Sequence, residues 1–460
     1  MHYDIAIIGG GPGGYAAGIY AGKRKAKVAL IEKCELGGTC LNRGCIPTKA
    51  LIHSARLFQD IKNAGKFGIA ADNVTINWND MQKNTVSIVK TLTKGVENLL
   101  KSNSVTVFKG TAKLADKNTI LISDKTEQMT ITADNIIIAA GSVPTILPIP
   151  GHDFQNVITS DEALFLEELP SSMLIIGAGV IGTEIGYIYN ALGTEVTIVE
   201  MLPEILPKLD DDISQELIRH LKTQGIKIYT DAKVKEIKQK ENTLQTFFET
   251  KEGIKFIDSE KVLIAVGRTP NTAAIEKLSC NIDKKGILVN DYLQTNIENI
   301  YAVGDITGKS MLAHVASHQG IVAIKNIMGE EHKMDYKAIP YCIYTNPEAA
   351  SVGMSEKEAK AIYKDNIKVG RFPYTANGKA MAIGEKSGFV KIIAESRYNE
   401  ILGVHIIGPC ATELIAEAVL AIKLECTAEE LADTIHAHPT LSEAVMEAAF
   451  DLLKEPIHKM

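Results

Sequence analysis

The chain has 460 residues, of which 45% are hydrophobic and 23% charged, and it carries a formal net charge of −7. A chain of this length exceeds a single compact core and predicts about three domains. The net negative charge and the lack of a long basic run argue against nucleic acid or an anionic membrane as the main partner.

The N-terminal residues run directly into a strand-like segment, without the basic region, apolar region and cleavage site of a secretory signal. No apolar stretch reaches about 18 residues, the length that a membrane-spanning helix needs. Seven cysteines are too few for a disulfide scaffold, and their odd number leaves at least one thiol unpaired in each chain. We therefore expect a protein of the reducing cytoplasm.

The first predicted unit is a strand–helix–strand segment that begins with DIAIIGGGPGGYAAG and closes with KVALIE. Its glycines form the pattern G-x-G-x-x-G, in which the first makes a tight turn and the second lets the backbone approach a pyrophosphate. The third allows close helix packing, and the closing acid accepts hydrogen bonds from a ribose. This unit predicts a dinucleotide site with Gly9, Gly11, Gly14 and Glu32.

Two cysteines follow in GGTCLNRGCIPTKA, at positions 40 and 45. They have three competing uses: a structural disulfide, half of a metal site, or a redox-active pair. A structural disulfide is not expected in a reducing compartment, where catalytic ones occur. A zinc site usually brings a second close pair of ligands, so we expect no metal. The cysteines beyond this motif stand alone in the sequence: Cys280, Cys342, Cys410 and Cys426.

A second strand–helix–strand unit begins with MLIIGAGVIGTEIG and closes with EVTIVE. Its residues Gly177, Gly179, Gly182 and Glu200 repeat the spacing of the first unit. One glycine motif alone is a weak signal, but two in the same context indicate two dinucleotide sites.

Two further segments, 136–151 and 262–272, each lead from a buried strand into a glycine turn and a proline, where open sheets present their ligand crevice. The segment IENIYAVGDIT then ends near Asp305. We expect linkers at 144–150 and around 329–339. Beyond the second linker, the pattern is typical of an α+β domain with antiparallel strands.

Taken in order along nearly the whole chain, these motifs resemble the flavin disulfide reductases. The cysteine motif, the segment Y-A-V-G-D at 301–305 and the segment H-P-T-L-S-E at 438–443 are the specific features. Within that family the pattern is most similar to the members that oxidise dihydrolipoamide as the third component of 2-oxoacid dehydrogenase or glycine cleavage complexes.

The resemblance implies an α/β fold with two Rossmann-like dinucleotide-binding domains and a C-terminal α+β dimerisation domain. The expected division is residues 1–145 with 265–335 for FAD, 146–264 for NAD and 336–460 for dimerisation. It also implies a homodimer with an active site shared between subunits and a lipoyl-bearing protein as partner. Which complex it serves is not decided by the sequence.

The cysteine pair is then a reversible disulfide. On one regular helix the two Cα atoms would lie roughly 8–9 Å apart, beyond the limit of about 7 Å for a disulfide. Because glycines flank the pair, we expect Cys40 at a helix start and a distorted turn before Cys45. The helix start would also favour thiolate.

By the same resemblance, Cys40 exchanges with the substrate dithiol and Cys45 faces the flavin. His438, oriented by Glu443, is the acid–base group, while His436 is expected to be structural. Lys49 lies near the flavin and pairs with Glu184. The implied reaction passes two electrons from the dithiol through the disulfide and FAD to NAD⁺.

The remaining cofactor contacts are also carried over from the resemblance. The expected FAD residues are Gly9, Gly11, Gly14, Glu32, Gly38, Thr39, Lys49, Gly110, Ala140, Gly141, Ser142, Asp305, Met311, Leu312, Ala313 and His314. The expected NAD residues are Gly177, Gly179, Gly182, Glu200, Val234, Gly267 and Arg268.

Related enzymes are less similar. NADPH-dependent glutathione-type reductases place basic residues where Met-Leu-Pro follows Glu200 here, and no cysteine follows Cys426, unlike in mercuric reductase. The open alternatives are a reductase of another disulfide or a metal, and a non-redox flavoprotein scaffold. The closing segment is apolar at helical spacing around Leu441, Val445, Ala448 and Leu452, a face that needs burying. The resemblance implies that a two-fold interface of the C-terminal domain buries it.

Overall fold

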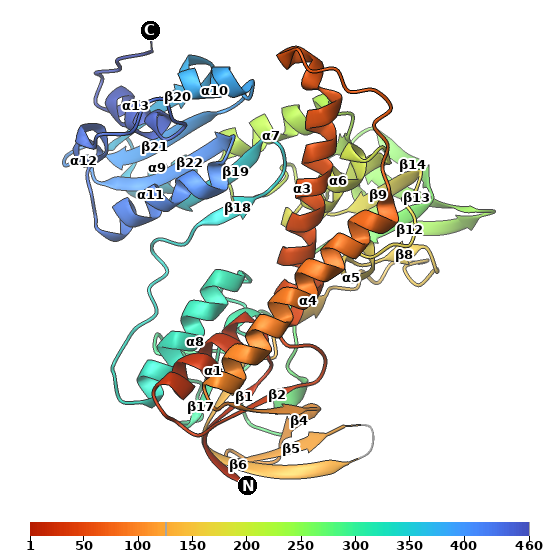
Figure 1. The fold of residues 1–460 in the computed structure, drawn as a ribbon, viewed down its shortest axis with the longest axis vertical. Coiled ribbons are helices and arrows are strands. Elements are labelled where there is room, and N and C mark those ends of the chain that lie inside the picture. Colours follow the sequence, from red (N-terminus) through yellow and green to blue (C-terminus); the bar gives the residue numbers. More distant parts are fainter. Residues whose placement is uncertain (125–126, 460) are drawn as a thin grey trace.

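The computed structural model describes residues 1–124 and 127–459. In Figure 1 the N-terminal sheet lies at the bottom, a second sheet lies to the right, and the C-terminal sheet lies at the upper left. In this part of the chain, no helix is long and apolar enough to cross a membrane.

The first sheet has the order β3-β2-β1-β6-β5-β4, with β17 added beside β6. Strands β1, β2, β3, β6 and β17 are parallel, so their carboxyl ends meet at one edge. Helices α1 and α8 pack against each other beside this sheet. The strands are β1 (His2–Ile8), β2 (Val28–Glu32), β3 (Thr106–Lys109), β4 (Thr111–Leu114), β5 (Thr119–Ser123), β6 (Gln128–Ile138) and β17 (Ile300–Ala302), and the helices are α1 (Pro12–Lys23) and α8 (Ala313–Ile327).

The second sheet, β11-β10-β9-β15-β8, is parallel and repeats the strand–helix–strand order of the first. A three-stranded antiparallel sheet, β12-β13-β14, and the pair β16-β7 accompany it. The elements are β7 (Ser142–Pro144), β8 (Val157–Ile158), α5 (Ser160–Ala163), β9 (Ser172–Ile176), α6 (Val180–Ala191), β10 (Glu195–Val199), α7 (Asp211–Thr223), β11 (Lys227–Tyr229), β12 (Lys233–Lys240), β13 (Thr243–Thr250), β14 (Gly253–Ser259), β15 (Lys261–Ile264) and β16 (Arg268–Pro270).

The C-terminal sheet, β18-β19-β22-β21-β20, is antiparallel throughout, which confirms the predicted α+β architecture. Of the segments predicted as linkers, 329–339 contains no helix or strand, and 144–150 contains none beyond Pro144, the last residue of β7. The elements are β18 (Tyr341–Ile343), β19 (Glu348–Gly353), α9 (Glu356–Tyr363), β20 (Ile367–Pro373), α10 (Gly378–Ile383), β21 (Phe389–Glu395), β22 (Ile401–Gly408), α11 (Ala411–Lys423), α12 (Ala428–Asp433) and α13 (Glu443–Leu452).

Helix α13 corrects one expectation about the dimer. Its apolar residues Val445, Ala448 and Leu452 are buried within the chain, in the core of the C-terminal sheet. The helix packs directly on β20 and β21. Helical periodicity therefore identified a buried face correctly, but this face packs inside its own domain and not against a second chain.

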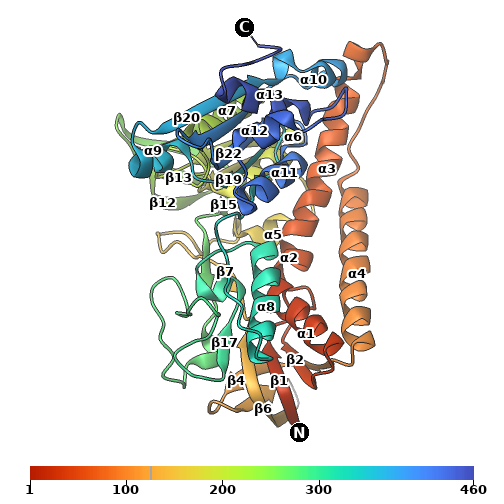
Figure 2. The same cartoon turned by 90° about the vertical axis from the view of Figure 1, so that its left-hand side faces the viewer.

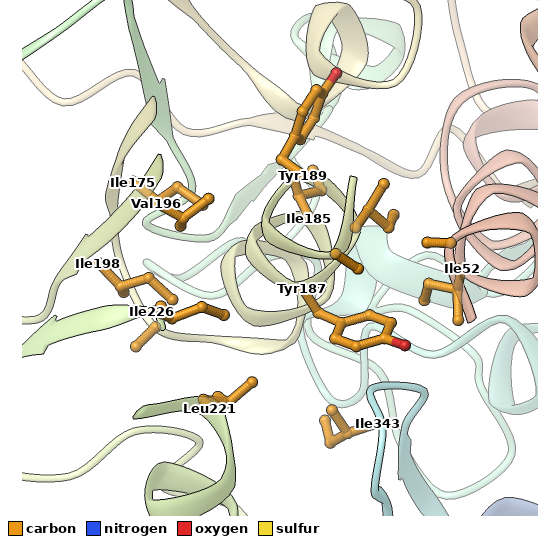
Figure 3. Close-up of a cluster of buried hydrophobic side chains, with 14 of the residues drawn as sticks. Ile52, Ile175, Ile185, Tyr187, Tyr189, Val196, Ile198, Leu221, Ile226 and Ile343 are labelled. Carbon is orange, nitrogen blue, oxygen red and sulfur yellow. The ribbon is translucent and has the colours of Figure 1, made fainter. Parts of the chain in front are cut away.

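Helices α2 (Gly38–Arg43), α3 (Cys45–Lys62) and α4 (Trp78–Ser102) interrupt the first sheet between β2 and β3. Figure 2 shows α3 rising beside α4 toward the C-terminal sheet. Ile52 on α3 joins a core with Tyr187 on α6 and Ile343 on β18, seen together in Figure 3. One hydrophobic core thus fixes three sequence-distant parts of the chain relative to one another.

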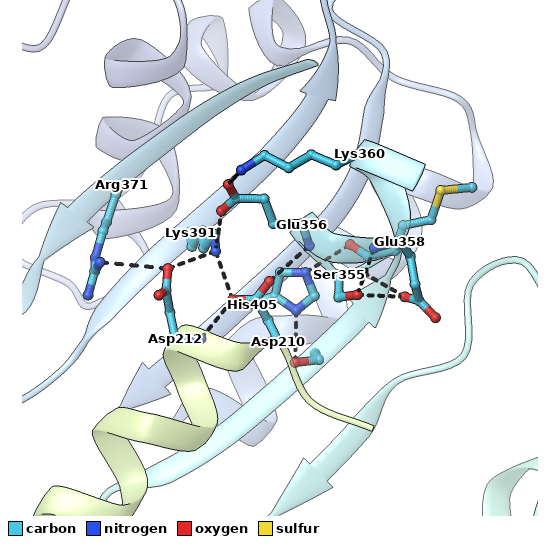
Figure 4. Close-up of polar contacts among 11 residues, drawn as sticks. Asp210, Asp212, Ser355, Glu356, Glu358, Lys360, Arg371, Lys391 and His405 are labelled. Carbon is cyan, nitrogen blue, oxygen red and sulfur yellow. Dashed lines mark hydrogen bonds and ion pairs between the residues drawn. The ribbon is translucent and has the colours of Figure 1, made fainter. Parts of the chain in front are cut away.

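A buried polar cluster also joins the second sheet to the C-terminal sheet (Figure 4). The Lys391 ammonium donates to Asp210 and Asp212 at 2.8 Å and lies 2.7 Å from Glu356. The side chains of Lys391 and Asp210 are each only 2% exposed. Burial opposes the lysine charge, but hydrogen bonds to the carboxylates raise the pKa of Lys391, so it stays protonated.

Replacing Lys391 by methionine should destabilise the fold by about 3–5 kcal/mol, because the substitution leaves the Asp210 carboxylate buried without a cation. Thermal or urea unfolding of the purified variant measures this loss. The matched control is Lys360→Met, which removes an ion pair to Glu356 from a lysine that is 60% exposed and should cost under about 1 kcal/mol. Equal losses in the two variants would contradict the prediction.

Candidate functional site

The two glycine motifs have the same three-part geometry. A Cβ on Gly9 would lie 2.2 Å from the Ala139 carbonyl oxygen, and a Cβ on Gly14 would lie 1.8 Å from the Gly9 carbonyl oxygen. The fold itself therefore requires glycine at both positions. A Cβ on the middle residue, Gly11, would have its nearest neighbour at 3.9 Å, and Gly11 lines an open cavity. The middle position of this first motif therefore leaves room for a ligand to approach the backbone.

The second motif repeats this pattern. Gly177 has φ +103° and Gly182 would place a Cβ 2.1 Å from the Gly177 carbonyl oxygen, while Gly179 has nothing within 4 Å. Each motif leads into a helix, α1 or α6, whose N-cap is the open middle glycine, Gly11 or Gly179. This arrangement suits a pyrophosphate.

Both predicted ribose acids lie at the end of the second strand of their unit. Glu32 accepts the N–H groups of Gly10 at 2.6 Å and Cys34 at 2.8 Å. Glu200 accepts those of Ala178 at 2.7 Å and Leu202 at 2.8 Å. The matching bonds fix both carboxylates at the cavity rim, where each oxygen retains a lone pair for a ribose hydroxyl.

A continuous cavity of about 1480 Å³ joins the two units. It lies along the carboxyl ends of the parallel strands of both sheets, where open α/β sheets bind ligands. Its volume exceeds that of a typical single-ligand pocket, about 300–1,000 Å³. All the predicted cofactor residues line it except Gly14 and Gly182, which instead pack helix against strand. The residues present therefore fit FAD and NAD.

The cysteine pair lies across a helix break. Helix α2 ends at Arg43, Gly44 has the irregular angles φ −146° and ψ −113°, and α3 begins at Cys45. This confirms the predicted distortion between the thiols. Cys40 lies in the first turn of α2, which begins at Gly38, and Cys45 is itself the first residue of α3. The helix N-terminus therefore favours thiolate at Cys45.

Both cysteines are free thiols that line the cavity and contact each other. The hydrogen bond from Cys40 lowers the pKa of Cys45 to about 7, against burial and with help from the charge of Lys49. The same hydrogen bond, together with burial, raises the pKa of Cys40. As the pH rises above about 7, the pair therefore becomes a Cys45 thiolate beside a protonated Cys40 thiol.

Lys49 lies one turn after Cys45 on α3, since this helix continues past Pro47. Its ammonium donates to Glu184 Oε2 at 2.8 Å, and the Glu184 side chain is only 4% exposed. The structure therefore brings together Cys45, Lys49 and Glu184 on one side of the cavity.

Arg268 was expected among the NAD residues, but its polar partners belong to the predicted FAD residues. It donates to the Ser142 hydroxyl and carbonyl at 2.8 Å and to Thr39 at 3.4 Å. Ser142 in turn donates to Asp305 at 2.6 Å. Burial lowers the pKa of Arg268. The Arg268 side chain therefore lies beside the predicted FAD residues Ser142 and Thr39.

His438 and Glu443 form the predicted dyad. His438 Nδ1 lies 2.8 Å from Glu443 Oε1, and a carboxylate only accepts, so this nitrogen carries a proton and Nε2 is the free acid–base atom. The other Glu443 oxygen accepts the N–H of Thr440 at 2.8 Å. Burial alone would raise the pKa of Glu443, but the bonds from Thr440 and His438 lower it.

His436 anchors the segment that carries His438. Its Nε2 lies 2.8 Å from Glu417 on α11, and its Nδ1 lies 2.8 Å from the Thr434 carbonyl oxygen. Both partners accept, so both nitrogens donate, and the bond to Glu417 raises the pKa of His436. This supports a structural role for His436.

The dyad does not reach the cysteine pair within one chain. Neither His438 nor Glu443 is among the described residues that line the cavity, and the His438 side chain is 78% exposed. One chain therefore presents the thiols in the cavity and the His438 ring outside it.

Several residues around the cavity had no signal in the sequence. Asp161 lies 4.0 Å from Arg268, and burial raises the pKa of Asp161. Tyr341, Cys342 and Tyr344 reach the cavity from the C-terminal sheet. Only long-range packing brings these residues there. Among the described residues, no group of three or more His, Cys, Asp or Glu is placed to hold a metal ion.

Comparison with known proteins agrees with this geometry. The family model "Pyridine nucleotide-disulphide oxidoreductase" matches residues 3–320, and the model of that family's dimerisation domain matches residues 339–449. A curated protein named dihydrolipoyl dehydrogenase from Bacillus subtilis (strain 168) is 40% identical over 99% of both chains. One of the same name from Chlamydia pneumoniae is 42% identical over 100% of this chain and 98% of the other.

Among solved structures, one is similar over 98% of this chain and 99% of the other, with a TM-score of 0.88 and 26% identity. It is the copper(II) complex of the HOCl-induced flavoprotein disulfide reductase RclA from Escherichia coli. The similarity therefore extends over both the cavity and the C-terminal sheet.

Proposed function

The chain belongs to the pyridine nucleotide-disulphide oxidoreductase family, and on this premise we propose that it catalyses the dihydrolipoyl dehydrogenase reaction. A lipoyl dithiol is oxidised to its disulfide, and NAD⁺ is reduced to NADH. The observation that carries this proposal is the free thiol pair Cys40 and Cys45, beside Lys49 and Glu184, in one cavity with two dinucleotide motifs.

The enzyme uses FAD and NAD. Bound FAD supplies a two-electron carrier between the cysteine pair and NAD⁺. The first motif, with Glu32, Ser142 and Asp305, would hold FAD. The second motif, with Glu200, would hold NAD.

The two cysteines have different tasks. In the oxidised enzyme they form a disulfide, which a substrate thiolate attacks at Cys40 while Cys45 leaves as thiolate. The low pKa of Cys45 makes it the better leaving group. The second substrate thiol then displaces Cys40, and the substrate leaves as its disulfide. The electron pair stays on the cysteine pair.

Both thiols of the substrate must lose a proton, and so must Cys40 in the reverse direction. We assign this task to Nε2 of the partner subunit's His438, because the dyad of the same chain lies outside the cavity wall. Glu443 holds the ring and stabilises its protonated form. A homodimer follows from the dimerisation domain; the shared site is our proposal.

The dithiol donor is proposed to be the lipoyl group of a partner protein, and we place the activity in the cytoplasm, where thiol pairs cycle by catalysis. The direct test is NADH formation, followed by its absorbance, by the FAD-loaded protein with dihydrolipoamide and NAD⁺. Turnover with reduced glutathione or a thioredoxin dithiol but not with dihydrolipoamide would overturn the proposal.

Glu200 should make the enzyme prefer NAD⁺ over NADP⁺. A 2′-phosphate at this position would meet a fixed carboxylate, at a cost of several kcal/mol, so kcat/KM for NADP⁺ should be at least about 10²-fold lower. Glu200→Ala should narrow this gap. Glu195→Ala, at the exposed start of the same strand, is the matched control and should leave the preference unchanged. Equal use of both cofactors by the unaltered enzyme would contradict the assignment.

A further inference from the structure

Tyr344 brings the C-terminal sheet into the redox site. It directly follows strand β18, where Ile343 is buried in the hydrophobic core, whereas Cys342 and Tyr344 line the cavity. The same cavity is lined by Cys45 and Lys49. A residue of the C-terminal sheet therefore faces the residues proposed to act with FAD.

Tyr344 makes two contacts with the Lys49–Glu184 pair. Its ring centroid lies 4.3 Å from the Lys49 ammonium, a cation–π distance. Its backbone N–H donates to Glu184 Oε1 at 3.0 Å. Because Lys49 donates to the other oxygen, Oε2, at 2.8 Å, both carboxylate oxygens are engaged. The three residues come from α3, α6 and the segment after β18.

These contacts restrict a flexible lysine. The Lys49 side chain is 31% exposed and has a long, rotatable stem, so its hydrogen bond to Glu184 alone leaves the ammonium free to turn around the carboxylate. The aromatic ring supplies a second attraction on another side of the ammonium. This matters because the Lys49 charge is one of the groups that lower the pKa of Cys45.

We propose that Tyr344 is a positioning residue of the redox site: its ring and its backbone N–H hold Lys49 and Glu184 in the arrangement that faces Cys45. This inference rests on the proposed function, since it takes Cys45 as the thiolate beside the flavin. The other groups that act on Cys45 are the Cys40 thiol on α2, the Glu184 carboxylate on α6, the Arg268 guanidinium and the Tyr15 hydroxyl on α1. Glu348 and Glu413, which act on the Tyr344 hydroxyl, are unaltered in the variants below.

The test compares Tyr344→Phe, which keeps the ring and the backbone N–H, with Tyr344→Leu, which keeps only the N–H. The readout is the long-wavelength thiolate-to-flavin absorption band of the two-electron-reduced, FAD-loaded enzyme, titrated with pH without any lipoyl substrate. Tyr344→Phe should titrate as the unaltered enzyme does. Tyr344→Leu should titrate at a pH about 0.5–1 unit higher, the size of a cation–π attraction expressed in pKa units.

FAD content and melting temperature check the fold, and Tyr344→Met replaces the leucine variant if that variant loses FAD.

The outcomes separate the inference from the proposed function. If the unaltered enzyme binds FAD but shows no such band at any pH, the assignment of Cys45 in the proposed function is wrong, and the inference is wrong with it. If the band is present and Tyr344→Leu titrates unchanged, or Tyr344→Phe shifts as far as Tyr344→Leu, the inference alone is overturned.

Discussion

Replacing Cys45 by serine is expected to abolish the long-wavelength absorption band of the reduced enzyme, whereas Cys40→Ser should keep such a band. Cys45 begins helix α3, lies one turn before Lys49 and has its pKa lowered to about 7, so it is the thiolate of the pair. The band of the unaltered enzyme should therefore grow as the pH rises through about 7. Both substitutions remove the disulfide and should lower dihydrolipoamide oxidation by at least about 10³-fold.

Visible spectra of the unaltered protein after two-electron reduction, and of the two variants with their FAD oxidised, measure the band, and steady-state rates with dihydrolipoamide and NAD⁺ measure the activity. Cys410→Ser is the matched control, because Cys410 is an exposed thiol at the start of α11 and should change neither the spectrum nor the rate. If Cys45→Ser retained the band and Cys40→Ser lost it, the assignments of the two thiols would have to be exchanged.

The parts of the site that the sequence predicted depend mostly on local geometry. A strand, a glycine turn and a helix are contiguous, so the positions of Gly9, Gly11 and Glu32 follow from neighbouring residues. The helix break at Gly44 was predicted from the limits that a disulfide places on a regular helix. The pairing of Lys49 with Glu184 came only from the family resemblance, since the residues lie on different helices.

The parts that the sequence did not predict depend on packing between distant segments. Tyr344 enters the cavity because β18 packs against α3 and α6, and a three-residue strand has too little pattern to show this. The buried face of α13 was visible as a helical period, but the period does not identify the surface that covers it. Arg268 follows a glycine turn of the second sheet, yet its side chain turns back to Ser142.

The second large effect concerns a site assembled from two chains. His438→Gln should lower dihydrolipoamide oxidation by about 10²–10⁴-fold, the contribution of a general acid–base group. A glutamine retains a polar side chain near Glu443 but has no atom that exchanges a proton near neutral pH. His436→Gln is a useful comparison: its loss of the bonds to Glu417 and Thr434 should loosen the segment and cost less activity.

Mixing a Cys40→Ser chain with a His438→Gln chain tests whether the thiols and the histidine act across the dimer. Each homodimer is inactive. In a hybrid dimer with shared sites, both substitutions fall in one active site and the other site is intact. Each hybrid dimer should therefore recover up to half the activity of the unaltered enzyme. Subunit exchange is verified by separating hybrids that carry two different affinity tags. In the control mixture, Cys40→Ser with Cys45→Ser, each chain of the hybrid lacks the cysteine disulfide, so neither active site is intact and no activity should be recovered. If verified hybrids of the first mixture remained inactive, or if an isolated monomer were fully active, His438 would have to serve its own chain, although it lies outside the cavity wall there.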